Sequence, residues 1–254
     1  MERPETMVLV ESSLYKGSWE EAFTAFFTSQ GMHFASLNIT TTSDGSGTTL
    51  GSIEQTLAHD LSDLSESAYT VLVARGPIQS LVAQYYLESL PLVGLVLVDP
   101  LILQNDGRGT GTDERWSDST QSLLKLLDDH ETHDKANVIT QKSSDLEPPL
   151  TALNKTETSA TELGLLQSLP SITNPRPLEL EPSSVPILVL YSSHHKYQDH
   201  YQKCAKSTAR FHSFDYDNAS VLEIAVKSDV GSAVEDDLDW VTEKVFEWYN
   251  EFVA

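Results

Sequence analysis

Short runs of apolar, often β-branched residues alternate along this chain with longer segments in which apolar positions recur every three or four residues. Runs of the first kind are typical of buried strands, and segments of the second kind are typical of amphipathic helices. Their regular alternation predicts a parallel sheet whose strands are joined by crossover helices. The expected fold class is therefore α/β.

The N-terminal part of the chain shows this alternation most clearly. Two helices are predicted to begin at capping boxes, which start at Ser18 and Ser52, and a third at Pro77, which suits the first helical position. A sharp turn is expected at residues 74–76, before this third helix. Buried strands are predicted at residues 7–10, 33–39, 69–73 and 92–98.

The pattern changes after residue 100. Residues 101–184 are poor in strand-like runs, and helical spacing within them is confined to 117–130 and 159–169. We expect one domain over residues 1–254, with 101–184 as a lid or cap insertion. Alternation then resumes, with a strand predicted at 185–190, a helix at 197–207, a strand at 211–216 and a last helix from about residue 234. This last helix carries an apolar stripe of Leu238, Val241, Val245, Trp248 and Phe252.

Charge and composition narrow the classes of partner. The 38 acidic and 16 basic residues give a net charge of −22, which opposes binding to nucleic acids and to anionic membranes. No apolar run is long enough to span a bilayer, and the first residues lack the pattern of a signal or transit peptide. The single cysteine, Cys204, suits a reducing compartment. We therefore expect a soluble, cytoplasmic, acidic protein without membrane insertion, whose acidic surface a basic partner could use.

The order of the predicted elements resembles that of the α/β-hydrolase superfamily with a lid domain. Residues 71–83 look like the strand, nucleophile elbow and helix of that family, residues 95–100 like the following strand, and 185–190 like the strand that leads to the catalytic acid. The resemblance covers nearly the whole chain, although the two N-terminal antiparallel strands of many members are missing. It implies a mostly parallel, doubly wound sheet.

The elbow departs from the family pattern at its centre. The family reads Gly-x-Ser-x-Gly, whereas this chain reads Ala-Arg-Gly-Pro-Ile from Ala74 to Ile78. Gly76 thus stands where the nucleophile would be, flanked by Arg75 and Pro77, and a glycine offers no nucleophile. It does suit a turn that needs a positive φ. Ser80 lies one helical turn further on and is expected to point along the helix rather than into the site.

The other catalytic positions depart as well. The resemblance places the acid near His195 and the histidine near Ser220, and no histidine follows His212. Without an imidazole, no general base activates a hydroxyl group. The oxyanion segment, usually His-Gly, reads Glu11-Ser12 here, and a carboxylate opposes a developing oxyanion. Glu11 could instead pair with Arg75 across the pocket.

Further candidate chemistry is weaker. His130 and His133 are spaced i and i+3, which suits a polar helix end better than a metal site, so no metal is expected, and no cofactor either. The glycines of 45–47 and 107–111 do not match a nucleotide-binding loop. His194 and His195, at the carboxyl edge of the expected sheet, are candidate ligand contacts.

These features predict a catalytically inactive α/β-hydrolase-like protein that binds a small molecule or a protein partner. Two alternatives stay open. One is an ester or thioester hydrolase with relocated groups, drawn from Ser80, Ser192 or Ser193 with His194 or His195. The other is a subunit of a larger assembly, for which an apolar patch on the last helix would be the sign.

Overall fold

A computed structural model of the 254-residue chain describes residues 6–12, 18–39, 50–64, 69–104, 115–116, 122, 178, 184–192, 198–213, 221–226 and 235–254. Apart from Ser122, the helices expected at 117–130 and 159–169 lie outside these residues, as does most of the lid insertion. The division into core and lid stays a prediction. In the described part of the insertion, β5 (Leu103–Gln104) pairs antiparallel with β6 (Arg115–Trp116).

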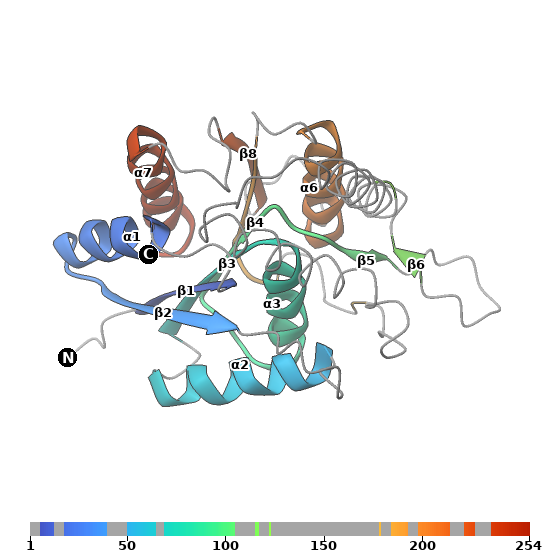
Figure 1. The fold of residues 1–254 in the computed structure, drawn as a ribbon, viewed down its shortest axis with the longest axis horizontal. Coiled ribbons are helices and arrows are strands. Elements are labelled where there is room, and N and C mark those ends of the chain that lie inside the picture. Colours follow the sequence, from blue (N-terminus) through green and yellow to red (C-terminus); the bar gives the residue numbers. More distant parts are fainter. Residues whose placement is uncertain are drawn as a thin grey trace, which may run out of the picture.

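A six-stranded sheet forms the centre of the molecule (Figure 1). Its order is β2-β1-β3-β4-β7-β8, and every pair of neighbouring strands is parallel. This arrangement confirms the predicted parallel α/β sheet. The strands are β1 (Thr6–Ser12), β2 (His33–Ile39), β3 (Thr70–Arg75), β4 (Gly94–Val98), β7 (Ile187–Ser192) and β8 (Val221–Val226).

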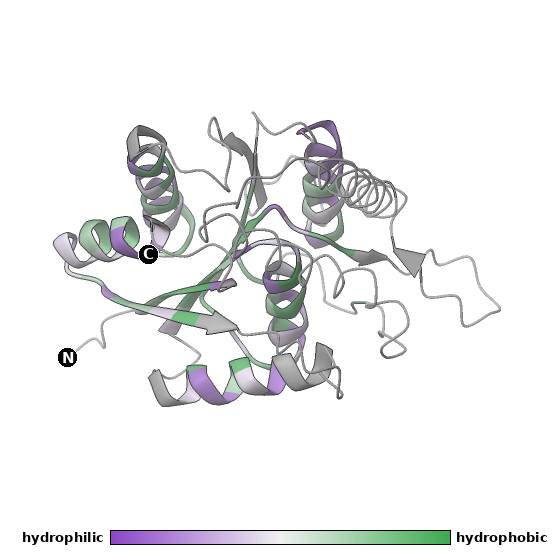
Figure 2. Cartoon of the chain, viewed as in Figure 1, coloured by the Kyte–Doolittle hydropathy of each residue, from purple (hydrophilic) through white to green (hydrophobic). Residues whose placement is uncertain are grey.

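Helices cover both faces of this sheet, so that it is doubly wound. Side chains alternate across each strand: Met7 and Leu9 pack in one apolar cluster with α1 (Ser18–Ser29) and α7 (Glu235–Phe252). Val8 and Val10 pack in a second cluster on the opposite face. The helices of that face are α2 (Leu50–Leu64), α3 (Pro77–Ser89) and α6 (Gln198–His212). Figure 2 shows the apolar colouring concentrated on the central strands and on the helix sides that face them.

The connections reverse direction between β1 and β3. From β1 the chain runs outward through α1 to β2, then returns through α2 to β3, on the other side of β1. In open parallel sheets, ligands bind beyond the carboxyl ends of the strands at such a switch point. Glu11 lies near the carboxyl end of β1, and Arg75 is the last residue of β3.

One predicted strand is wrong. The segment 211–216 was expected to be a strand, but α6 continues through His212, and the last strand of the sheet is β8, Val221–Val226. In the sequence, Phe214 and Tyr216 alternate with Ser213 and Asp215, which is typical of a strand, but the burial pattern of α6 continues through His212. The buried residues of α6 are Cys204, Ala205, Thr208, Ala209 and His212.

Smaller differences concern element ends. The helix expected from Ser52 begins two residues earlier, at Leu50. A capping pattern in the sequence marks the start of a helix only to within one or two residues. Strand β3 extends through Arg75, so the expected turn at 74–76 narrows to Gly76. The last helix keeps its predicted stripe, with Leu238, Val241, Val245 and Trp248 buried. Within the part of the chain that is described, no helix is long and apolar enough to cross a bilayer.

Candidate functional site

The turn between β3 and α3 has the backbone conformation that a glycine permits. Gly76 has φ 105° and ψ 163°, a region essentially closed to other residues, and Pro77 follows as the first residue of α3. The Gly76 N–H donates to the carbonyl of Val98 at 3.0 Å, and its carbonyl accepts from the Ser80 N–H at 2.9 Å. The glycine at the expected nucleophile position therefore has a conformational cause.

A buried ion pair joins the carboxyl ends of β1 and β3. Arg75 Nη1 lies 3.0 Å from Glu11 Oε2, and each side chain is only 2% exposed. In register, Val10 pairs with Ala74, so Glu11 and Arg75 come next along neighbouring strands, and strand alternation turns both toward the α1 and α7 face. The pairing raised as a hypothesis in the sequence analysis is confirmed, and the two charges lie at the switch point between β1 and β3.

Trp19 of α1 completes this cluster. The Arg75 Cζ atom lies 4.4 Å from the centroid of the Trp19 ring, a cation–π geometry, and Trp19 is 1% exposed. The sequence analysis did not single out Trp19. The available signal was its helical spacing with Phe23 and Phe27, which places all three on the face of α1 that packs on the sheet.

Burial dominates the electrostatics of the pair. It raises the pKa of Glu11 above its ordinary value, although the neighbouring Arg75 charge and hydrogen bond act in the opposite direction. Taking two charges out of water costs several kcal/mol per ion, and their attraction returns this only when the geometry is good. The Glu11–Arg75–Trp19 cluster is therefore costly to bury, and it lies at the position that the sequence resemblance assigns to the oxyanion segment.

Ser80, the relocated nucleophile of the hydrolase alternative, is held by the backbone. Its Oγ lies 3.1 Å from the carbonyl oxygens of both Ala74 and Val98, and the side chain is fully buried. The hydroxyl proton is thus directed at main-chain acceptors. This bonding ties the start of α3 to the ends of β3 and β4.

A second buried polar group continues from Ser80 along α3. Gln84 Nε2 donates to the carbonyls of Ser80 and Leu101, at 2.9 and 2.8 Å, which leaves its Oε1 as an acceptor. His212 Nε2 lies 3.0 Å from this Oε1 and therefore carries the proton. Burial lowers the pKa of His212 to about 4, so the ring is neutral near pH 7. The imidazole joins α6 to α3 within the core.

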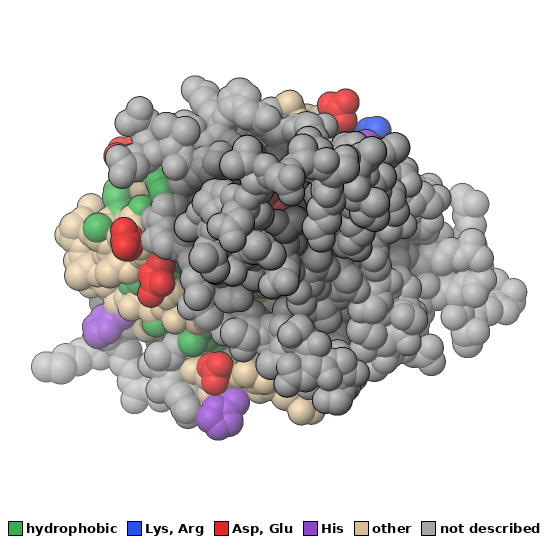
Figure 3. Space-filling view, viewed as in Figure 1, with side chains coloured by type: hydrophobic (Ala, Val, Ile, Leu, Met, Phe, Trp, Pro, Cys, Tyr) green, Lys and Arg blue, Asp and Glu red, His purple; other side chains and the backbone are tan. Residues whose placement is uncertain are grey.

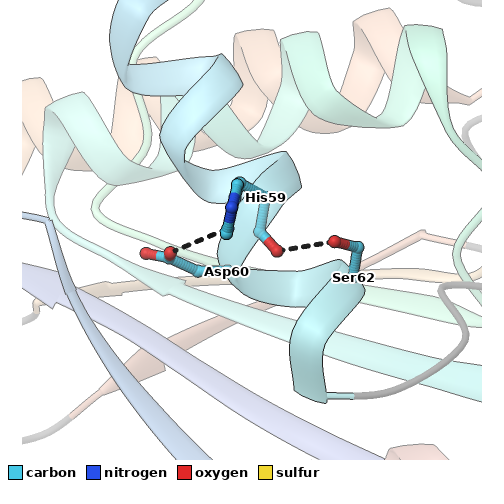
Figure 4. Close-up of polar contacts among 3 residues, drawn as sticks. All are labelled: His59, Asp60 and Ser62. Atoms are coloured by element: carbon cyan, nitrogen blue, oxygen red, sulfur yellow. Dashed lines mark hydrogen bonds and ion pairs between the residues drawn. The ribbon is translucent and has the colours of Figure 1, made fainter.

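A serine, a histidine and an aspartate also meet on α2 (Figure 4), but they do not form a catalytic triad. The Ser62 hydroxyl donates to the main-chain carbonyl of His59 at 2.7 Å and not to the ring. His59 Nδ1 lies 3.8 Å from Asp60 Oδ1, and the two side chains are 74% and 46% exposed. This group lacks the bond from hydroxyl to imidazole that would activate a nucleophile.

Several predicted positions lie outside the residues that the structure describes. These are His130, His133, His194, His195 and Ser220. Ser12 is placed as the last residue of β1, without its side chain. Because β8 begins at Val221, Ser220 precedes the last strand, and the position that the resemblance assigns to the histidine moves beyond Val226. Among the residues that the structure describes, no cluster of His, Cys, Asp and Glu is arranged to hold a metal ion.

Comparisons with known proteins identify the fold. A scan against family models and a search of curated proteins found no match. NosK from Streptomyces actuosus is 12% identical with a TM-score of 0.60, over 98% of this chain and 99% of that chain. The esterase EaEST from Exiguobacterium antarcticum is 12% identical with a TM-score of 0.56, over 97% and 92%. MenH from S. aureus is 14% identical with a TM-score of 0.55, over 99% and 95%. With this parallel sheet and these likenesses, the chain has the α/β-hydrolase fold.

Proposed function

We propose that this chain is a non-catalytic α/β-hydrolase-like protein that acts as a binding module for a small molecule or a protein partner. The buried Glu11–Arg75 pair is the observation that carries the proposal. It sets a carboxylate beside the elbow, where ester hydrolysis needs hydrogen-bond donors for a developing negative charge. Gly76 supplies no side chain at the centre of that elbow.

The described serines and histidines near the elbow support the same proposal. Ser80 Oγ faces two carbonyl oxygens, and His212 is buried against Gln84. A general base must come within hydrogen-bond reach of the proton that it removes. Neither side chain lies within hydrogen-bond reach of the other.

The single cysteine fits the further proposal that the protein works in the cytoplasm.

Ester hydrolysis is the direct test. The purified protein is assayed with p-nitrophenyl esters of short, medium and long acyl chains, beside a triple variant Ser80→Ala, His194→Ala, His195→Ala. We expect no turnover above that of the triple variant. Turnover that is robust in the unmodified protein and lost in the variant would contradict the proposal and assign catalysis to relocated groups.

A matched control separates an active site from surface chemistry. An exposed imidazole slowly hydrolyses activated esters, so the variant His59→Ala, Ser62→Ala removes an exposed pair on α2. If this variant and the triple variant lower a weak background equally, the background is unspecific imidazole chemistry and does not come from one active site. Labelling with a fluorophosphonate gives an independent readout, and we expect no modified serine.

A further inference from the structure

The outer edge of β2 is open within the described part of the chain. Strand β2 ends the six-stranded sheet, and β1 pairs with all seven of its residues on the inner side. No described strand pairs with the other side. Such an edge presents main-chain N–H and C=O groups that can pair with another strand. Figure 1 shows β2 as the end strand of the six-stranded sheet, with α1 and α2 on its two faces.

We propose that this edge binds an extended segment of a partner protein that carries Lys or Arg residues, so that the segment adds a strand to the sheet. Main-chain hydrogen bonds along the edge supply the affinity in this mode of recognition. The charge of the surrounding surface selects the partner. For the binding module of the proposed function, this edge would be the binding surface and a basic segment the partner. The edge site rests on the proposed function only in this link.

The composition of β2 lacks the features that keep an edge strand from pairing. Natural edges are protected by charged residues, proline, bulges or shortness. The segment His33–Ile39 contains no Lys, Arg, Asp, Glu, Pro or Gly, and its register with β1 is continuous. At the other end of the sheet, β8 carries a charged residue, Glu223. Of the two edge strands, β2 therefore has the composition suited to pairing.

The faces of β2 resemble those of an interior strand. Phe34 packs against the cluster of α1 and α7, whereas Ala35 and Leu37 pack against the cluster of α2, α3 and α6. Apolar residues on both faces are typical of strands buried between two helical layers. These residues are nevertheless only half-buried, so an added strand would cover them further. The Ser36 Oγ is buried without a hydrogen-bond partner, and a polar side chain opposite it can supply one.

The charge around the edge favours a basic partner. No Lys or Arg occurs from Gly17 to Ala74, which includes α1, β2 and α2, and the acidic residues of this segment are Glu20, Glu21, Asp44, Glu54, Asp60, Asp63 and Glu66. Figure 3 shows acidic side chains on the part of the described surface where α1 and α2 lie. A second copy of this chain would bring like charges together, which disfavours self-pairing. Positive charges beside an incoming strand would instead be attracted.

A designed peptide tests the proposal without knowledge of the natural partner. The probe has nine residues, alternating Thr and Val with a Lys at each end. One control replaces both Lys residues by Glu, and another places Pro at the centre, where it removes a donor and disrupts pairing. Binding to the full chain is measured by fluorescence anisotropy in low salt. Amide hydrogen exchange locates the site.

We expect the Lys-ended peptide to bind at least tenfold more tightly than the Glu-ended peptide, with the advantage reduced in high salt. The Pro peptide should not bind, and new protection should fall on residues 33–39. Asp60→Asn, on α2, should weaken binding of the Lys-ended peptide, whereas Asp199→Asn, on α6 beside β7 and β8, should leave it unchanged.

Three results would overturn the proposal: no binding, equal binding of the two charged peptides, or protection confined to another element. A fourth is sedimentation of the protein alone as a dimer with residues 33–39 protected, which would assign the edge to a second copy. Each outcome is independent of ester turnover. A failure here therefore leaves the proposed loss of catalysis standing, and activity in the ester assay leaves the edge site standing.

Discussion

Two buried polar groups lie on opposite faces of the sheet beside the same turn, and they differ in kind. On the α1 and α7 face, Glu11 and Arg75 form a charged pair under Trp19. On the other face, Ser80, Gln84 and His212 form a neutral chain of hydrogen bonds between α3 and α6. The polar atoms of the neutral group lose little free energy on burial, because they are hydrogen-bonded. Each charge of the pair is far more costly to bury and relies on the opposite charge to offset that cost.

This difference separates structural residues from candidate functional ones. A neutral network that ties two helices together is an ordinary core feature. A charged pair at the switch point of the sheet is costly, and hydrophobic residues of similar size often serve stability as well or better. We therefore propose Glu11 and Arg75, rather than the neutral group, as the residues of this region to test for a function.

The largest expected effect comes from breaking the charged pair. Arg75→Met leaves Glu11 buried without its partner, and we expect unfolding to become easier by about 3–5 kcal/mol. The double variant Arg75→Met, Glu11→Leu removes both charges and should recover most of this loss. Urea denaturation of both variants measures the effect. Equal destabilisation of the two would show that packing around Arg75, and not its charge, dominates.

The turn between the two groups should respond next. Gly76→Ala places a Cβ on a residue with φ 105°, and we expect a loss of about 1–3 kcal/mol from backbone strain alone. Gly31→Ala is a matched control for the strain of a positive φ. Gly31 has φ 80°, but it lies at the exposed end of α1, away from both polar groups. A Gly76→Ala variant as stable as the original protein would mean that the turn relaxes.

The two groups should give opposite dependences on pH. The pKa of His212 falls to about 4 in the folded protein from 6.5, so the unfolded chain binds an extra proton between these values. Stability should fall as pH drops below about 6.5, by up to about 1.4 kcal/mol per pH unit. The raised pKa of Glu11 has the opposite sign, since it lowers stability as pH rises above about 4.5.

Denaturation at several pH values separates these contributions. His212→Gln keeps an amide that can bond Gln84 but removes the titrating ring, so the stability of this variant should fall less than that of the original protein between about pH 6.5 and about pH 5. Parallel curves for the two proteins would contradict the burial of a neutral His212.

The smallest effect is expected within the neutral group. Ser80→Ala removes one hydroxyl near two carbonyls, of which the Val98 carbonyl still accepts from the Gly76 N–H. We expect a loss of about 0.5–1.5 kcal/mol in the free energy of unfolding. A loss as large as that of Arg75→Met would remove the contrast between the two groups.

Much of the fold was predictable because local patterns and tertiary packing agree. The strands 33–39 and 185–190, the helix at Pro77 and the stripe of the last helix all appear close to their predicted places. The segment 211–216 failed, since its alternating aromatic residues outweighed a helical burial pattern that ends at His212. Periodicity alone cannot tell which of two overlapping patterns will meet the core.

The sequence by itself determined the order of the elements, the absence of a nucleophile at Gly76 and the acidity of the segment around β2, because these depend on residue identity and spacing. Only the tertiary structure decided which strands are neighbours. That choice brought Glu11 to Arg75 across 64 residues, placed Trp19 over the guanidinium group and left β2 at the edge. The physical reason is that pairing between distant strands is set by how both faces of the sheet are buried together, which no local pattern contains.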